Sequence, residues 1–278
     1  MPRYKLTIEY AGTRYSGWQK QKNARTVQGE LERAIGEATR DKSIEFMGSG
    51  RTDAGVHALR QVAHLDVRKG LPAETLRRGI NDALPADIHV LAVDSVPHRF
   101  HARHGAVARS YLYQISRRRT AFAKQYVWWV KDTLDVDRMQ AAAARFTGMH
   151  DFQAFSDDDP DEKSTEVLVE DVTLAEAGDL ILIRIGGSHF IWKMVRRMVG
   201  VLAAIGKGDL EVDDIDVLLG GTSTSALRAT ADKKVPPLRT KVRPAEVTAP
   251  AAGLFLERVF YPGDQRQWPL QPAVPVGR

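Results

Sequence analysis

Residues 48–66 read GSGRTDAGVHALRQVAHLD, a glycine-flanked loop that leads directly into a strand. Within the loop, Asp53 lies between Arg51 and the small residues Ala54 and Gly55. Glycine permits backbone conformations that other residues avoid, and a loop so shaped displays a single carboxylate at its tip. We therefore interpret Asp53 as a candidate nucleophile. The spacing alone favours an ordinary turn, in which an aspartate accepts backbone hydrogen bonds.

Strand and helix patterns surround this stretch on both sides. Alternating apolar residues predict strands over residues 4–10, 63–67, 88–92, 111–115, 167–174, 180–185 and 254–260. Apolar residues at helical spacing predict helices over residues 27–38, 72–84, 135–146, 190–205 and 212–219. Strands mixed with helices in two loosely similar halves indicate a two-lobed α+β (mixed α/β) protein. We expect an N-terminal lobe over residues 1–105, a C-terminal lobe over 106–263 and an irregular tail over 264–278, with the active-site cleft between the lobes.

Composition narrows the function classes. The chain has 278 residues, of which 43% are hydrophobic and 27% charged, and it contains no cysteine. This excludes disulfides, thiolate nucleophiles and cysteine-ligated metal sites, and it predicts a cytoplasmic protein. The longest apolar stretch, residues 198–205, is too short to span a bilayer. The net charge is only +5, but basic residues cluster around positions 99–119, 193–197 and 233–243. Such clusters suit a polyanion such as nucleic acid or a solvated surface.

Several side chains are candidates for binding. The glycines around Asp53 match neither the dinucleotide nor the P-loop spacing, so we expect no nucleotide cofactor. The histidines of HRFHARH, residues 98–104, are spaced poorly for a strand-borne metal site and lie among arginines, so we expect no metal. Tyr111 and Tyr113 share a strand face, where they either pack in the core or stack on a base. Arg103 and Arg109 lie nearby for phosphate.

The predicted helix over residues 190–205 carries a basic patch on an apolar background. Lys193 and Arg197 are further candidates for RNA contact. Arg196 lies beside the apolar face, where it either extends to water or pairs with a buried carboxylate. The second option would join Arg196 to Asp53, because a nucleophilic carboxylate in a pocket needs a cationic partner to stay ionised.

The motifs together resemble a known family. The segment GRTDAGVHA, residues 50–58, resembles the active-site loop of the tRNA pseudouridine synthase A family. Further segments resemble that family in the same order: YKLTIEYAGTRYSGWQ, TVQGELERAI, NDALPADIHV, FHARHGAVARSYLY, FIWKMVRRMVG and TAPAAGLFLERVFYP. The resemblance covers most of residues 4–262 and implies the pseudouridine synthase fold, in which two similar lobes share a mainly antiparallel sheet. It also implies a homodimer that acts on the anticodon arm of tRNA without a cofactor.

The resemblance further implies a reaction and a role for each matching residue. Uridine at tRNA positions 38, 39 and 40 is isomerised to pseudouridine. Asp53 matches the catalytic aspartate and Tyr111 the tyrosine that packs on the target base. Arg51 matches an arginine that helps to displace that base, Arg196 the basic partner of the aspartate, and Leu254 an apolar wall of the pocket. The basic stretch over residues 229–247 is longer than the corresponding link in the family. This difference bears on how tRNA is bound rather than on the reaction.

Alternatives remain open. Asp53 either attacks the sugar or the ring as a nucleophile, or it takes a proton from the sugar. A non-catalytic RNA-binding or tRNA-folding protein on the same scaffold would show the same basic clusters and aromatic residues. A small-molecule enzyme is a third possibility, but no coenzyme loop supports it.

Overall fold

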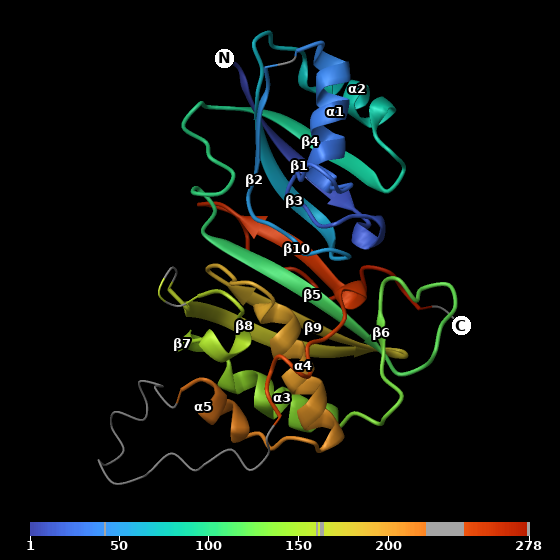
Figure 1. Ribbon diagram of the computed structural model, residues 1–278, viewed down its shortest axis with the longest axis vertical. Coiled ribbons are helices and arrows are strands. Elements are labelled where there is room, and N and C mark those ends of the chain that lie inside the picture. The colour runs from blue at the N-terminus through green and yellow to red at the C-terminus, as the bar shows by residue number, and fades with distance from the viewer. Residues whose placement is uncertain (42, 160, 162–163, 221–241, 277–278) are drawn as a thin grey trace. The chain divides into compact units, whose positions relative to one another are not determined.

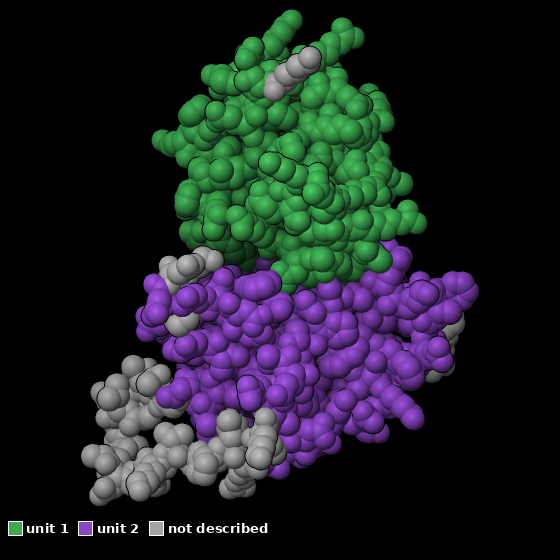
Figure 2. Space-filling model, viewed as in Figure 1, with its two compact units in different colours: residues 1–109, 255–267 green, residues 110–254, 268–278 purple. Residues whose placement is uncertain are grey.

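A computed structural model describes residues 1–41, 43–159, 161, 164–220 and 242–276 (Figure 1). The chain divides into two compact units, which Figure 2 shows in different colours. Unit 1 comprises Met1–Arg109 and Phe255–Gln267, and unit 2 comprises Ser110–Leu254 and Trp268–Arg278. The division after Arg109 lies close to the predicted boundary at residue 105. The last strand and the tail are assigned differently, because residues 255–267 return to unit 1 and residues 268–278 belong to unit 2.

Unit 1 is a sheet with two helices. Its elements are β1 (Arg3–Tyr10), α1 (Val27–Thr39), β2 (Glu45–Gly48), β3 (His57–Asp66), α2 (Ala73–Ala83), β4 (Ile88–Val96) and β10 (Leu254–Phe260). The strand order is β4-β1-β3-β10, and β2 also pairs with β3. Strand β1 runs antiparallel to β3 and β4, whereas β10 runs parallel to β3 with Phe255 opposite His57. That pairing explains why the last strand returns to unit 1.

Side-chain alternation decides which face of the unit 1 sheet is buried. Leu6 and Ile8 of β1 are fully buried, whereas the intervening Lys5 and Thr7 are partly exposed. Helix α1 begins where predicted, because the Thr26 side chain accepts the Gly29 N–H at 3.3 Å. Helices α1 and α2 pack together and present apolar stripes to the core.

Unit 2 repeats the combination of sheet and helices. Its elements are β5 (Ala108–Ser116), β6 (Trp128–Trp129), α3 (Val136–Arg145), β7 (Gly148–Asp151), β8 (Glu166–Ala177), β9 (Leu180–Gly187), α4 (Met194–Lys207) and α5 (Asp214–Leu218). The strand order is β5-β9-β8-β7. Strand β6 runs parallel to β5, and β8 runs antiparallel to both β7 and β9. Every residue of β9 is buried. The mixed α+β class with a mainly antiparallel sheet is therefore confirmed.

Two elements begin four or more residues from their predicted starts. The helix predicted from residue 190 begins at Met194, because Lys193 has the left-handed φ of 62°. The Trp192 N–H instead donates to the Asp158 carboxylate at 2.9 Å. Strand β3 begins at His57, well before the predicted residue 63. Most of the basic stretch over residues 229–247 lies outside the described residues. In the part of the chain that the structure describes, no helix is long and apolar enough to cross a membrane.

Candidate active site

The Asp53 loop, residues 49–56, is held against the loop that joins β1 to α1, residues 11–26. The Trp18 N–H donates to the Thr52 carbonyl at 3.0 Å, and the Gly55 N–H donates to the Tyr15 carbonyl at 3.3 Å. Within the Asp53 loop, the Val56 N–H donates to the Asp53 carbonyl at 3.1 Å and closes a turn. Backbone hydrogen bonds from a second segment therefore fix the residues on both sides of Asp53.

Two side chains anchor the chain on either side of Asp53. Thr52 is buried, and its hydroxyl shares a 2.8 Å hydrogen bond with the Tyr10 hydroxyl. On either side of the buried Thr52, Arg51 is exposed and Asp53 is half-buried. His57 follows the loop, and its Nδ1 accepts the Gly12 N–H at 3.0 Å. The imidazole therefore carries no proton on Nδ1.

Two glycines make the close approach of these loops possible. Gly17 has a φ of +90°, and a Cβ at this position would lie 2.6 Å from the Thr52 carbonyl oxygen. A Cβ on Gly12 would lie 1.9 Å from the Val56 carbonyl oxygen. Real Cβ atoms essentially never come closer than 3.0 Å, so a side chain at either position would displace the Asp53 loop.

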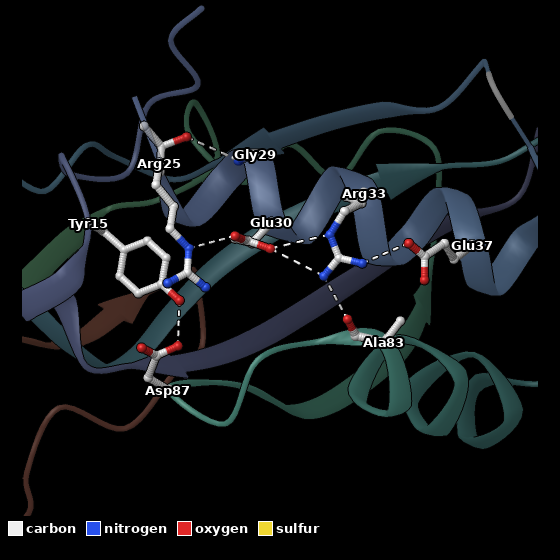
Figure 3. A network of polar contacts seen from close by, with 9 residues as sticks. Tyr15, Arg25, Gly29, Glu30, Arg33, Glu37, Ala83 and Asp87 are labelled. Carbon is white, nitrogen blue, oxygen red and sulfur yellow. Dashed lines mark hydrogen bonds and ion pairs between the residues drawn. The ribbon is translucent and has the colours of Figure 1, made fainter. Parts of the chain in front are cut away.

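A polar network also holds the β1–α1 loop (Figure 3). The Tyr15 hydroxyl donates to the Asp87 carboxylate, and the Arg25 guanidinium lies 4.9 Å from the Tyr15 ring centre. Arg25 Nε also donates to Glu30 at 2.7 Å, and Arg33 bonds the same carboxylate from the next turn of α1. These guanidinium contacts lower the pKa of Glu30 below its usual range. The network ties Tyr15, whose carbonyl contacts the Asp53 loop, to helix α1.

Unit 2 contains the predicted tyrosines, and their surroundings separate them. Tyr113 is fully buried, and its hydroxyl donates to the Pro250 carbonyl at 2.8 Å. Burial raises its pKa well above the usual value. Tyr111 is only half-buried, and it meets Phe190 edge to face with ring centres 5.1 Å apart. Tyr113 is thus a core residue, whereas Tyr111 forms a half-buried aromatic pair with Phe190.

Arg196 and Leu254 flank the segment that links α4 to β10. Arg196 Nε donates to the Ala249 carbonyl at 2.7 Å, and the Ala249 N–H returns a bond to the Arg196 carbonyl at 3.0 Å. Leu254 is 5% exposed and begins β10. The first bond orients the Arg196 guanidinium, and the second joins the two backbones.

The other two basic residues of the α4 region contact a carboxylate. Lys193 Nζ lies 2.8 Å from Asp157, and Arg197 pairs with the same residue. Both contacts lower the pKa of Asp157. The Arg197 side chain is only 4% exposed, which favours a structural role over the predicted contact with RNA.

Arg103 and Arg109 lie in unit 1. Arg103 is exposed, and Arg109 Nη2 donates to the carbonyls of Ser49 at 3.2 Å and Arg103 at 3.3 Å. Arg109 thus contacts the start of the Asp53 loop, which the sequence did not indicate. Over the described ranges, no three histidine, aspartate or glutamate side chains gather so that they could hold a metal ion.

Comparisons with known proteins agree on one family. A sequence profile for tRNA pseudouridine synthase matches residues 6–104 and 142–262. Proteins named tRNA pseudouridine synthase A from Rhodopseudomonas palustris strains BisA53 and BisB18 are 44% and 42% identical over 264 residues, covering 94% of this chain and 100% of each relative. A Clostridium tetani protein named tRNA pseudouridine synthase A 2 is 35% identical over 261 residues, covering 92% of this chain and 98% of that protein.

The chain belongs to the tRNA pseudouridine synthase family. The matched ranges of that family include the Asp53 loop, α4 and β10, whereas Tyr111 lies between them. Sequence reasoning missed the residues that position the family loop here, namely Gly12, Gly17 and His57. His57 lies within GRTDAGVHA and both glycines lie within YAGTRYSGW, but no local pattern joins the two segments.

Proposed function

We propose that this protein isomerises uridine to pseudouridine in tRNA, at positions 38, 39 and 40 of the anticodon arm. One observation carries the proposal at the level of chemistry. Asp53 is a half-buried carboxylate in a loop whose backbone is fixed on both sides by bonds to Tyr15 and Trp18. A nucleophile needs this kind of preorganisation, because small displacements from the reactive geometry cost large factors in rate. Relatives that align with 94% of this chain at 42–44% identity are named tRNA pseudouridine synthase A.

The proposed reaction breaks the N-glycosidic bond, rotates the uracil and joins its C5 to the sugar. C5 loses its proton at the end and N1 gains one, so the product is an isomer of the substrate and the reaction needs no redox cofactor. A stacked base must first leave the helix, which costs a few kcal/mol. Stacking on the half-buried Tyr111 returns about 1–3 kcal/mol, and the exposed Arg51 is available to fill the vacated position.

Arg196 and Leu254 complete the proposal. We assign to Arg196 the task of keeping Asp53 ionised, since a guanidinium near a carboxylate lowers the carboxylate pKa by about 1–3 units. Leu254 supplies an apolar wall for the uracil. The acting species is a homodimer, and light scattering of the purified protein at micromolar concentration measures that directly.

The deciding experiment compares Asp53→Asn with Asp82→Asn, which makes the same chemical change on the exposed side of α2. Each purified variant is incubated with unmodified tRNA, and pseudouridine is mapped by mass spectrometry. Asp53→Asn should bind tRNA and form no product, whereas Asp82→Asn should match the wild type. Pseudouridine at positions 38–40 from the Asp53→Asn variant would refute the assigned role of Asp53. Binding without product from the wild type would favour the non-catalytic RNA-binding alternative.

A further inference from the structure

Unit 1 has a hollow of about 250 Å³ that the proposed chemistry does not use. Its lining includes Lys5 of β1, Arg60 and Val62 of β3, Arg258 and Phe260 of β10, and Asp264 of the following turn. Lys5 alternates with Tyr4 and Leu6, which are 5% and 0% exposed, so it faces away from the core beneath α1 and α2. The hollow therefore lies on the sheet face opposite those helices.

The charge of the hollow is unbalanced. It gathers three cationic side chains against one carboxylate, that of Asp264, which already accepts the Tyr261 N–H at 2.8 Å. Arg60 is exposed and makes no hydrogen bond or ion pair with the described residues. Like charges so close together destabilise one another unless an anion joins them.

Several other basic residues of unit 1 are neutralised locally. On α1 and α2, Arg33, Arg77 and Arg78 each pair with a glutamate of the same helix. Their charges are the ordinary solvated pairs of a helix surface. The hollow differs because its cations come from separate strands, and because Arg60 pairs with no carboxylate of the described residues.

The floor of the hollow strengthens its attraction for an anion. Val62 and Phe260 are 4% and 5% exposed, and the Arg266 guanidinium lies 6.0 Å from the Phe260 ring centre. A charge resting on buried apolar atoms is screened less than one in open water. The hollow thus offers an apolar base with a ring of cationic side chains around it.

We propose that this hollow binds two or three phosphodiester groups of the tRNA backbone, a contact that rests on the proposed function. Its lining is made of strand side chains and a turn, with no glycine-rich loop or helix N-terminus to enclose the terminal phosphate of a free nucleotide. An open site with cations on three strands suits a backbone that passes across it, and such contacts position RNA without reading its sequence.

The test compares two triple variants of the full chain. One carries Lys5→Gln, Arg60→Gln and Arg258→Gln. The other carries Arg68→Gln, Lys69→Gln and Arg78→Gln, three exposed residues of unit 1 that do not line the hollow. The dissociation constant for tRNA is measured by filter binding between 50 and 300 mM NaCl. The hollow variant should lower the slope of log affinity against log salt by about 2–3 and the control variant by less than about 1.

Additional measurements keep the outcomes separate. Arg60→Gln alone should lower the slope by about 1, and Arg60→Lys should restore it, which guards against misfolding of the triple variant. Equal slopes for the two triple variants would overturn the phosphate contact. Tight binding of 5′-UMP by the wild type, lost in the hollow variant, would also overturn it in favour of a free nucleotide. Wild-type protein that binds tRNA but forms no pseudouridine would refute the proposed function. The salt slopes of the variants would still show whether the hollow contacts the tRNA backbone.

Discussion

The contact between the β1–α1 loop and the Asp53 loop can be tested with one methyl group. In Gly17→Ala the new Cβ would lie 2.6 Å from the Thr52 carbonyl oxygen, so that carbonyl must move by about 0.4 Å to reach the closest distance that real Cβ atoms show. The left-handed φ of +90° costs an additional ~1–2 kcal/mol for alanine. Overpacking adds about 1–3 kcal/mol.

The total of about 2–5 kcal/mol is smaller than the 5–15 kcal/mol by which a typical protein is stable, so the variant should fold. The midpoint of thermal unfolding should fall by about 5–15 °C. Because Asp53 follows Thr52 directly, the displacement reaches the carboxylate, and kcat for pseudouridine formation should fall tenfold or more.

Gly263→Ala is the matched control. Gly263 has a φ of +91° in the same unit, and a Cβ there would meet nothing within 4 Å. The control carries the backbone penalty without the collision, so it should lose about 1–2 kcal/mol of stability and keep the wild-type kcat. Thermal unfolding and single-turnover pseudouridine assays on both variants decide the matter. Equal losses of stability with unchanged kcat in Gly17→Ala would show that the β1–α1 loop does not position Asp53.

Three other predictions concern stability and stacking. His64 is buried, which lowers its pKa to about 4. Between pH 6.5, the pKa of about 6.5 in the unfolded chain, and pH 4, only the unfolded chain takes up a proton there, so stability should fall by about 3 kcal/mol over this range. Chemical denaturation of His64→Gln should show a flatter dependence of stability on pH. Asp157→Asn leaves the buried guanidinium of Arg197 without its carboxylate and should cost about 3–5 kcal/mol by urea titration, a reading refuted by a loss below 1 kcal/mol. Tyr113→Phe removes a buried hydrogen bond and should cost about 1–2 kcal/mol, whereas Tyr111→Ala should leave the unfolding midpoint nearly unchanged and weaken product formation; the reverse pattern would exchange their roles.

The sequence predicts those parts of the fold that depend on neighbours along the chain. Strand β1 and helix α1 are predicted closely because alternation and the Thr26 cap are local signals. The parallel pairing of β10 with β3 is not predicted, since it joins residues about 200 positions apart. The left-handed Lys193 is not predicted either, because the Asp158 carboxylate that binds the preceding N–H is distant in sequence.

The candidate site shows the same division. The segment GRTDAGVHA itself predicts a loop that bears Asp53. The separate environments of Tyr111 and Tyr113 do not follow from their shared alternation, because the Pro250 carbonyl that accepts from Tyr113 is more than 130 residues away. Burial of Arg197 is likewise invisible in a helical pattern that places it among basic neighbours.

The conformation of the Asp53 loop depends on residues 10–18 as much as on its own sequence. The Tyr10 hydroxyl, the Trp18 N–H and the Tyr15 carbonyl all bond to residues 52–55. Two glycines, Gly12 and Gly17, are needed for the approach itself. A GRTDAGVHA sequence placed in a protein without YAGTRYSGW would therefore lack the partners that fix its carboxylate. The two segments form one structural unit, and substitutions in residues 10–18 should impair activity before they unfold the protein.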